Sequence, residues 1–278
     1  MNLYDTTSFQ LSEQVTKNYS TSFYSATRMF DNNMRMAIFS IYGFVRYADE
    51  IVDTFHEFDK KSLLESFEND YYQAYKKGIS LNPILHSFQL TVKKFNLSDS
   101  HIQSFLRSMK MDLDKRKYTT SAEINEYIYG SANVVGLMCL KVFCNGDDML
   151  YRELEEPAAR LGSAFQKVNF LRDLKSDIEN LDRNYFPATT KDGFTEQEKL
   201  KIVEDIENDF KQALCGIKKL PKNSRFPVTV AYFYYLSLLA KIKNTPATRI
   251  IAKRIRISNT TKINIMVKSF VVNKLNLI

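Results

Sequence analysis

The most informative stretch of this chain is Tyr42-Gly43-Phe44-Val45-Arg46-Tyr47-Ala48-Asp49-Glu50-Ile51-Val52-Asp53. Its apolar residues recur every three or four positions, which predicts a helix with one buried face. On that helix Asp49 and Asp53 are one turn apart and share a face, and Arg46 lies one turn before Asp49. Two like charges beside apolar residues oppose folding unless a cation or a basic partner lies between them. The stretch therefore indicates a site for a positively charged group.

A second stretch repeats this arrangement more than a hundred residues later. Asn169, Asp173 and Asp177 follow one another at intervals of four, so they form one stripe along a helix. If the two helices face each other, their aspartates line a cleft whose oxygen ligands suit Mg²⁺ with bound phosphate. A single acidic pair is usually a solvated helix face. Two pairs, each preceded by Arg or Asn in an apolar frame, favour a site.

The composition favours helices throughout the chain. The 278 residues include only 8 Gly and 6 Pro, and no segment alternates polar and apolar residues as a strand does. No internal repeat or linker divides the sequence, so we expect one all-α domain over residues 1–278. Helices are predicted at residues 8–28, 34–55, 60–77, 80–95, 98–114, 121–144, 148–182, 196–217, 224–243 and 247–275.

Three places interrupt this helical pattern. The hydroxyl cluster Ser20-Thr21-Ser22 predicts a kink or a phosphate contact, because such residues disfavour a helix interior. Gly130 and Gly136 belong to a surface of small residues that lets a second backbone or a ligand approach closely. Pro157 either kinks the helix at 148–182 or starts a new one.

The positive charge of the chain is concentrated near its C-terminus. The net charge is +7, and residues 241–278 contain nine Lys or Arg and no Asp or Glu, which leaves −2 (7 − 9) for the rest. Such a segment suits nucleic acid, an anionic membrane surface or a diphosphate. No known nucleic-acid-reading module accompanies the charge, so we expect no nucleic acid. Peripheral contact with an anionic membrane and simple solvation of the cations are both open.

Cysteine and histidine usage excludes several classes of protein. The three cysteines form no CxxC pair and leave one unpaired, which indicates a reducing cytosol. The three histidines are scattered, so neither a zinc site nor a Ser-His-Asp triad is predicted. The N-terminus lacks the apolar segment of a signal peptide, and the best membrane-span candidate, 228–240, is too short. We therefore expect a soluble cytoplasmic protein, peripheral at the inner face of the cell membrane if its basic segment binds lipid.

Several motifs along the chain resemble those of the squalene and phytoene synthase family, whose members join two prenyl diphosphates head to head. The matching segments are Ser20-Thr21-Ser22-Phe23, Tyr42 to Asp53, Met111-Asp112-Leu113, Tyr127 to Met138, Leu161 to Asp173 with Asp177, and Tyr185-Phe186-Pro187. Two departures are visible. Asp49-Glu50 stands where many members have two aspartates, and Lys167-Val168 replaces a more apolar pair. Neither departure removes an expected metal ligand.

The resemblance implies a single-domain, all-α class I isoprenoid synthase bundle with a central cleft. The short length of the chain and its sequence from Tyr42 to Asp53 are most similar to those of bacterial phytoene synthases of carotenoid biosynthesis. That similarity implies a prenyltransferase that condenses two geranylgeranyl diphosphates to phytoene through a cyclopropyl diphosphate intermediate, with release of diphosphate. The implied cofactor is Mg²⁺, or Mn²⁺ in its place, and no nicotinamide is expected.

The resemblance also implies a role for individual residues. The metal ligands would be Asp49, Asp53, Asn169, Asp173 and Asp177. The substrate-binding residues would be Ser20, Ser22, Tyr42, Arg46, Gln166, Asn169, Tyr234, Arg254 and Lys262. Arg46 and Tyr129 would join the four aspartates in catalysis, with Tyr129 near the carbocation as a participant in proton removal.

Three alternatives are open. A squalene or dehydrosqualene synthase would use farnesyl diphosphate, and it would differ in tunnel length and in its use of reduced nicotinamide. A different class I prenyltransferase or terpene cyclase would share the metal ligands but not Ser20-Thr21-Ser22-Phe23. A non-catalytic relative acting as an assembly factor would not need both aspartate pairs, which are intact here.

Overall fold

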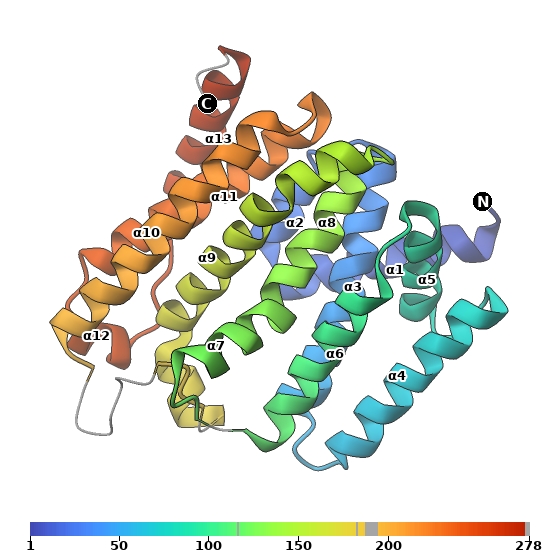
Figure 1. Ribbon diagram of the computed structural model, residues 1–278, viewed down its shortest axis with the longest axis horizontal. Helices are drawn as coiled ribbons and strands as arrows, with labels where there is room; N and C mark the ends of the chain where they lie inside the picture. The colour runs from blue at the N-terminus through green and yellow to red at the C-terminus, as the bar shows by residue number, and fades with distance from the viewer. Residues whose placement is uncertain (116, 182, 187–193, 276–278) are drawn as a thin grey trace.

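The computed structural model of the protein describes residues 1–115, 117–181, 183–186 and 194–275, which form a bundle of helices (Figure 1). Pro187, at the end of the segment Tyr185-Phe186-Pro187, lies outside these residues. Within them, the only bridge between extended segments joins Lys117 to Asn184, so the all-α class is confirmed. The helices are α1 (Leu3–Tyr19), α2 (Thr21–Thr27), α3 (Asn32–Thr54), α4 (Lys60–Lys77), α5 (Pro83–Phe95), α6 (Asp99–Asp114), α7 (Ser121–Ile128), η1 (Tyr129–Asn133), α8 (Val134–Cys144), α9 (Asp148–Leu181), α10 (Glu196–Lys219), α11 (Lys222–Lys243), α12 (Ala247–Ala252) and α13 (Asn259–Lys274).

Local sequence signals set many of the helix ends. The side chains of Thr120 and Thr195 accept hydrogen bonds from the backbones of Glu123 and Glu198, which form capping boxes at the starts of α7 and α10. Gly78 ends α4 in the left-handed conformation with φ of 79°, where a Cβ atom would be strained. The predicted break at Ser20 is confirmed, because this residue separates α1 from α2.

Helix α3 lies at the centre of the aromatic core. Phe44 is fully buried, and its ring stacks on that of Phe88 with centroids 4.0 Å apart. Phe67 and Tyr71 of α4 and Phe105 of α6 surround the same ring. Complete burial of a Phe side chain stabilises the fold by about 1.5–3 kcal/mol. This packing fixes the rotation of α3 and therefore the direction of its polar face.

The predicted helix 121–144 is interrupted by a π-helical turn, η1. The small residues here allow close packing of backbones. A Cβ atom on Gly130 would lie 2.6 Å from the Ser104 carbonyl oxygen of α6. A Cβ atom on Gly136 would lie 3.1 Å from the Ala158 carbonyl oxygen of α9. Of the two uses left open by the sequence, the structure therefore shows the approach of a second backbone. Pro157 is accommodated inside one continuous helix, α9.

One helical segment of the described chain, Ser121–Cys144, is long and apolar enough to span a membrane, with a mean hydropathy of 1.4. The segment 228–240, which the sequence offered as the best candidate, is not the one that meets this test. Half of the apolar window is buried, and α3, α6 and α9 pack against its α8 part. Its composition is therefore that of a helix in the core of the bundle.

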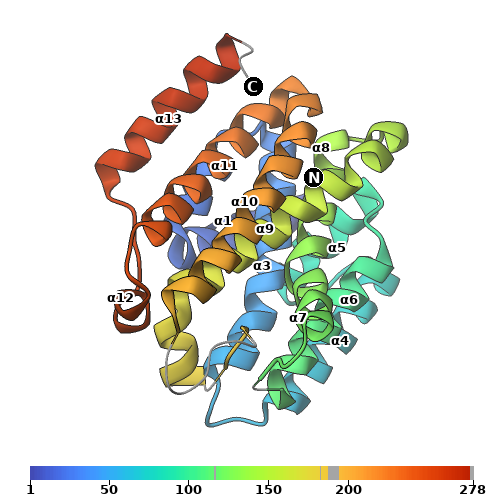
Figure 2. The ribbon, with the colours of Figure 1, turned by 60° about the vertical axis from the view of Figure 1, so that its left-hand side comes forward.

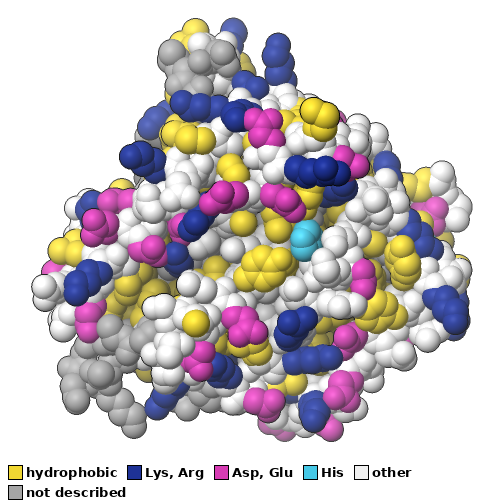
Figure 3. Space-filling view, in the orientation of Figure 1, with side chains coloured by type: hydrophobic (Ala, Val, Ile, Leu, Met, Phe, Trp, Pro, Cys, Tyr) yellow, Lys and Arg dark blue, Asp and Glu magenta, His cyan; other side chains and the backbone are white. Residues whose placement is uncertain are grey.

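Two features of the arrangement matter for function. The C-terminal ends of α3, α6 and α9 all reach the same end of the bundle, the lower end in Figure 1 and again in Figure 2. Helix α13 lies at the outer edge of the molecule and packs mainly against α11 (Figure 2). In Figure 3, Lys and Arg side chains gather at the upper end of the molecule, where α13 lies.

Candidate functional site

The first aspartate pair lies on the C-terminal half of α3. Asp49 and Asp53 are half-buried, next to the fully buried Ala48 and the buried Val52. Burial and the neighbouring charge of Asp53 raise the pKa of Asp49 to about 8. Asp49 forms no hydrogen bond or ion pair with another described side chain. The raised pKa therefore reflects negative charge that the surrounding protein leaves uncompensated.

The second pair lies on α9 and faces the first. Burial raises the pKa of Asp177 to about 7, and the charges of Asp173 and of Asp53 on α3 add to the effect. Asp173 is held by two arginines, Arg172 at 2.5 Å and Arg254 at 2.7 Å. The effect of Asp53 on Asp177 shows that the two acidic faces lie near each other, which the spacing within each helix could not decide.

A buried arginine that the sequence interpretation missed joins these faces. The Arg183 guanidinium donates to Asp53 Oδ1 at 2.7 Å and to the Asp112 backbone carbonyl at 3.2 Å. Its Nε lies 3.7 Å from Asp112 Oδ1, and both side chains are 2 % exposed. The Arg183 backbone N–H donates to the Asp177 carbonyl at 2.8 Å. Arg183 therefore links α3, α6 and the end of α9. Its place two residues before Tyr185-Phe186 was the available signal, together with Asp112 in the motif Met111-Asp112-Leu113.

The tyrosine that joins this network is Tyr127, and the role expected for Tyr129 beside the carbocation stays a prediction. The Tyr127 hydroxyl donates to Asp112 Oδ2 at 2.8 Å and lies 3.5 Å from the Tyr185 hydroxyl. Tyr129 is 44 % exposed and forms no hydrogen bond with the aspartates among the described residues. Two residues along a helix differ by about 200° in direction, so Tyr127 and Tyr129 point to opposite sides.

Residues predicted to bind diphosphate on α2 and α3 lie beside the first pair. Burial raises the pKa of Tyr42 to about 12, and its side chain has Ser20 as a hydrogen-bond partner. Arg46 forms an ion pair with Glu50, and its guanidinium lies 4.4 Å from the centroid of the Tyr19 ring. Ser22 is half-buried on α2. Ser20, Tyr42 and Arg46 therefore form one polar group on the side of α3 that carries Asp49.

Residues predicted on α9 and beyond are only partly brought together. Asn169 accepts a hydrogen bond from the Tyr235 hydroxyl at 3.2 Å, and Tyr234 and Tyr235 both interact electrostatically with Arg172. Arg254, in the segment between α12 and α13, reaches Asp173.

Two other predicted residues have weaker support. Gln166 is half-buried on α9, one turn before Asn169. Lys262 lies in the first turn of α13, and no contact within the described chain links it to the other predicted residues. Helix α13, which carries it, packs mainly against α11.

The donor atoms fit a hydrated divalent cation better than a closed metal cage. Among the described residues, no three Asp, Glu, His or Cys side chains lie close enough to enclose an ion. The carboxylates form two pairs instead, with the amide of Asn169 on the same stripe as the second pair. Mg²⁺ usually keeps several waters and takes one or two carboxylates together with substrate phosphate oxygens. Asp49 and Asp177 have no ion-pair partner among the described side chains, so their carboxyl groups would be open to such a cation.

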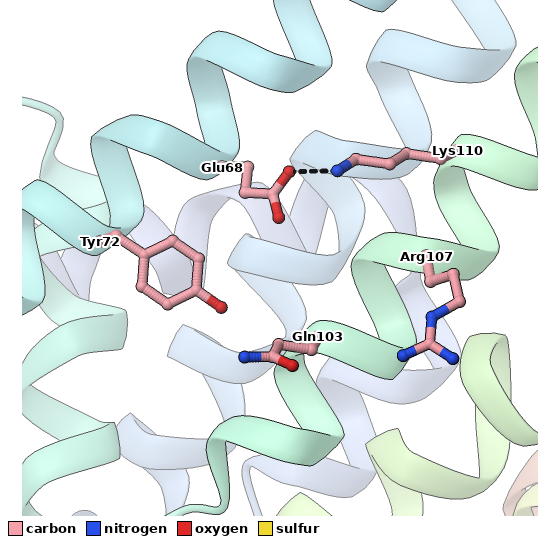
Figure 4. Close-up of a pocket in the computed structure, with 5 residues that line it drawn as sticks. All are labelled: Glu68, Tyr72, Gln103, Arg107 and Lys110. Carbon is pink, nitrogen blue, oxygen red and sulfur yellow. Dashed lines mark ion pairs between the residues drawn. The ribbon is translucent and has the colours of Figure 1, made fainter.

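Other hollows in the surface do not overlap the predicted residues. A hollow of about 350 Å³ between α4 and α6 is lined by Glu68, Tyr72, Gln103, Arg107 and Lys110 (Figure 4). Its polar groups are mostly paired within the chain. Glu68 bonds Lys110 at 2.5 Å, and both Tyr72 and Gln103 donate to Asp99. A second hollow, of about 460 Å³, includes His101 near the start of α6. Neither hollow contains a predicted site residue, so the acidic faces remain the candidate site.

Comparison with known proteins gives the same family from sequence and from structure. The family model for squalene/phytoene synthase matches residues 16–261. A phytoene synthase from Arthrospira platensis is 28% identical over 262 residues, covering 85% of this chain and 84% of that protein. A 15-cis-phytoene synthase from Synechocystis sp. is 29% identical over 263 residues, covering 84% and 76%.

Solved structures share the fold at lower sequence identity. A dehydrosqualene synthase in complex with ligand superposes with a TM-score of 0.80 at 19% identity, covering 97% of this chain and 98% of that one. A squalene synthase from Alicyclobacillus acidocaldarius gives a TM-score of 0.77 at 19% identity, covering 92% and 98%. The match of the family model to most of the chain, with this fold, shows that the chain belongs to the squalene/phytoene synthase family.

Proposed function

We propose that this protein condenses two geranylgeranyl diphosphates head to head, forming phytoene through a cyclopropyl diphosphate intermediate with release of diphosphate. The observation that carries the proposal is the pairing of two acidic faces, on α3 and α9, at one end of the bundle. Chemistry on allylic diphosphates needs a concentration of cations around the leaving group, and these faces supply the ligands for them. The relatives named as phytoene synthases support the choice of product.

In this proposal the metal ligands are Asp49, Asp53, Asn169, Asp173 and Asp177. Mg²⁺, when bound, would neutralise charge that develops on the departing diphosphate oxygens. The protein cations that would bind the same diphosphates are Arg46, Arg172 and Arg254. Arg172 and Arg254 already contact Asp173, so substrate diphosphate would join a group of charges that is held in position. The remaining substrate contacts are proposed for Ser20, Ser22, Tyr42, Gln166, Tyr234 and Lys262.

A buried aromatic cluster next to Arg183 is suited to protecting a carbocation. The rings of Phe170 and Tyr185 stack at 4.0 Å, and those of Tyr127 and Tyr118 lie 5.3 and 5.5 Å from Tyr185. Aromatic faces attract positive charge and exclude water from it. Burial raises the pKa of Tyr127, so its phenol keeps its proton and acts as a hydrogen-bond donor to Asp112. We propose that this hydrogen bond fixes the orientation of the aromatic cluster.

Incubation of the purified protein with Mg²⁺ and either farnesyl or geranylgeranyl diphosphate tests the proposal, with and without reduced nicotinamide. Phytoene from the C20 substrate, formed without reductant, is the expected product. A C30 hydrocarbon from farnesyl diphosphate would instead support the second candidate, a squalene or dehydrosqualene synthase, which is the activity named for two solved structures of the same fold. Absence of any hydrocarbon, with both substrates bound, would point to a non-catalytic member of the family. We propose a cytoplasmic location for the enzyme.

A further inference from the structure

Helix α13 carries an apolar face that is largely exposed in the described part of the chain. We call this face the α13 stripe, and it consists of Ile263, Met266, Val267, Phe270 and Val271. Its members follow one another at helical spacing, and Ile263, Val267 and Phe270 are 57%, 58% and 56% exposed. The buried residues of α13, Ile265 and Ser269, lie on the opposite side. The stripe therefore points largely away from the protein, and the Phe270 ring touches α11, edge-on to Phe226 with centroids 6.2 Å apart.

The α13 stripe differs from ordinary exposed hydrophobic residues. Single apolar side chains are common on protein surfaces and need no explanation. Here five of them form a continuous line over more than two helical turns, on a helix that packs mainly against α11 and lies at the edge of the molecule (Figure 2). Contiguous apolar surface of this kind usually marks a binding face.

The charges around the stripe indicate a negatively charged partner. Lys262 and Lys268 flank it on opposite sides, with the Lys268 ammonium 4.5 Å from the centroid of the Phe233 ring of α11, and Lys274 follows at its end. Of the nine cations in residues 241–278, two form ion pairs within the described chain, Lys243 with Glu207 and Arg254 with Asp173. Seven (9 − 2) therefore have no acidic partner there, and the segment contains no Asp or Glu to balance them. An apolar face with flanking lysines is the pattern of a helix that lies in a membrane interface.

We propose that α13 binds flat on an anionic lipid bilayer, with the α13 stripe at the boundary of the acyl chains and its lysines among the lipid phosphates. A second copy of the chain fits the observations less well. Two such stripes in contact would bring like charges together, which costs several kcal/mol when they are juxtaposed. A helix of 16 residues is also only about 24 Å long, too short to bury the roughly 800 Å² per partner of a stable interface.

This surface has a direct connection to the candidate site. Arg254, which contacts Asp173, lies five residues before the start of α13 at Asn259. The segment between them therefore ties the bilayer-binding helix to the acidic face of α9. Lipid binding itself does not require the proposed reaction, so it can be tested separately from catalysis.

Co-sedimentation with vesicles tests the apolar part of the proposal. The protein should bind vesicles of phosphatidylcholine and phosphatidylglycerol at low salt, bind pure phosphatidylcholine much less, and dissociate at high salt. The double variant Val267→Glu, Phe270→Glu should bind at least about tenfold more weakly, because two apolar side chains that would enter the bilayer are lost. The matched control is Ile79→Glu, Leu81→Glu, which changes the charge equally at two exposed apolar residues remote from α13 and should bind as the unmodified protein does.

A second pair of variants tests the charged part. Lys268→Gln, Lys274→Gln should weaken binding by about fivefold for each lysine removed. Lys76→Gln, Lys77→Gln on the exposed end of α4 should not. No binding at low salt, equal binding to neutral vesicles, or equal losses in both members of a pair would overturn the proposal. A dimer in light scattering that Val267→Glu, Phe270→Glu dissociates would overturn it in favour of a second copy.

Discussion

At the scale of single residues, the four aspartates of the candidate site are not equivalent. Asp173 has Arg172 and Arg254 as partners, and Asp53 has Arg183. Asp49 and Asp177 have no such partner among the described side chains, and burial raises the pKa of both. In the absence of a metal, the negative charge of one residue in each pair is therefore unfavourable, and that residue holds its proton to a higher pH than usual.

This difference predicts that Asp49→Ala and Asp173→Ala both lower activity but differ in their effect on stability. Asp49→Ala and Asp173→Ala should each lower turnover about a thousandfold or more at saturating Mg²⁺, because each removes a cation ligand. Without metal, Asp49→Ala should be at least as stable as the unmodified protein. Asp173→Ala should lose about 1–3 kcal/mol, since it leaves two arginines unpaired. Product assays and urea unfolding provide the measurements, with exposed Asp70→Ala as control. Near-normal turnover in either variant would refute the metal-binding assignment.

The same residues predict how the stability of the metal-free protein depends on pH. The pKa is about 8 for Asp49 and about 7 for Asp177 in the folded protein, against about 4 for an unfolded chain. The folded state therefore holds protons that the unfolded state has released, and stability falls as pH rises from about 4 towards 8. Urea unfolding in a chelator at pH 6, 7 and 8 should show this decline. Asp49→Asn should reduce the slope, and an unchanged slope would contradict the assignment.

The sequence predicted these residues by spacing but could not predict their partners. Residues four apart on a helix share a face whatever the tertiary structure, so both aspartate pairs were visible. Arg183 follows α9 and reaches α3 and α6, which only the folded chain brings near it. The rotation of α7, which sets Tyr127 against Asp112, depends on packing. The packing of α13, which carries Lys262, on α11 likewise does not follow from position along the chain.

At the scale of elements, the contact between α9 and η1 depends on glycine. A Cβ atom on Gly162 would lie 2.8 Å from the Ala132 carbonyl oxygen and 3.1 Å from Asn133 Cα, both of them backbone atoms. Helical periodicity predicted most helix boundaries to within a few residues. It did not predict η1, because one extra residue in a turn leaves no distinctive mark in a sequence of small side chains.

This contact predicts a result opposite to the usual effect of the substitution. Replacing Gly by Ala inside a helix normally stabilises it by about 1 kcal/mol. Gly162→Ala should instead destabilise the protein by about 1–3 kcal/mol, because rigid backbone must move to admit the methyl group. Gly43→Ala is the control with a milder expected effect. The nearest atom to its added Cβ would be the Ser12 hydroxyl oxygen at 3.2 Å, which can rotate away. Urea unfolding of both variants gives the comparison, and a stabilised Gly162→Ala would show that the helices have room between them.

At the scale of the whole molecule, the candidate site is assembled from distant parts of the chain. One acidic face belongs to α3 and the other to α9, and Arg183 joins them at one end of the bundle. A diphosphate held between the faces would need cations on both, since neither pair alone encloses an ion. Its binding is therefore a property of the folded arrangement, and it should stabilise that arrangement by linkage.

We accordingly expect Mg²⁺ and inorganic diphosphate to stabilise the protein more together than the sum of their separate effects. At about one hundred times the dissociation constant, a ligand that binds only the folded state adds about 2.7 kcal/mol, which corresponds to roughly 5–10 °C in melting temperature. Asp49→Asn on α3 and Asp173→Asn on α9 should each abolish this additional stabilisation, so that the two ligands act only additively. The reason is that the diphosphate then loses its cations on one side. Thermal unfolding with each ligand alone and with both measures this stabilisation. Additive shifts, or an excess that survives either substitution, would show that a single helix binds the diphosphate and that the two faces do not act together.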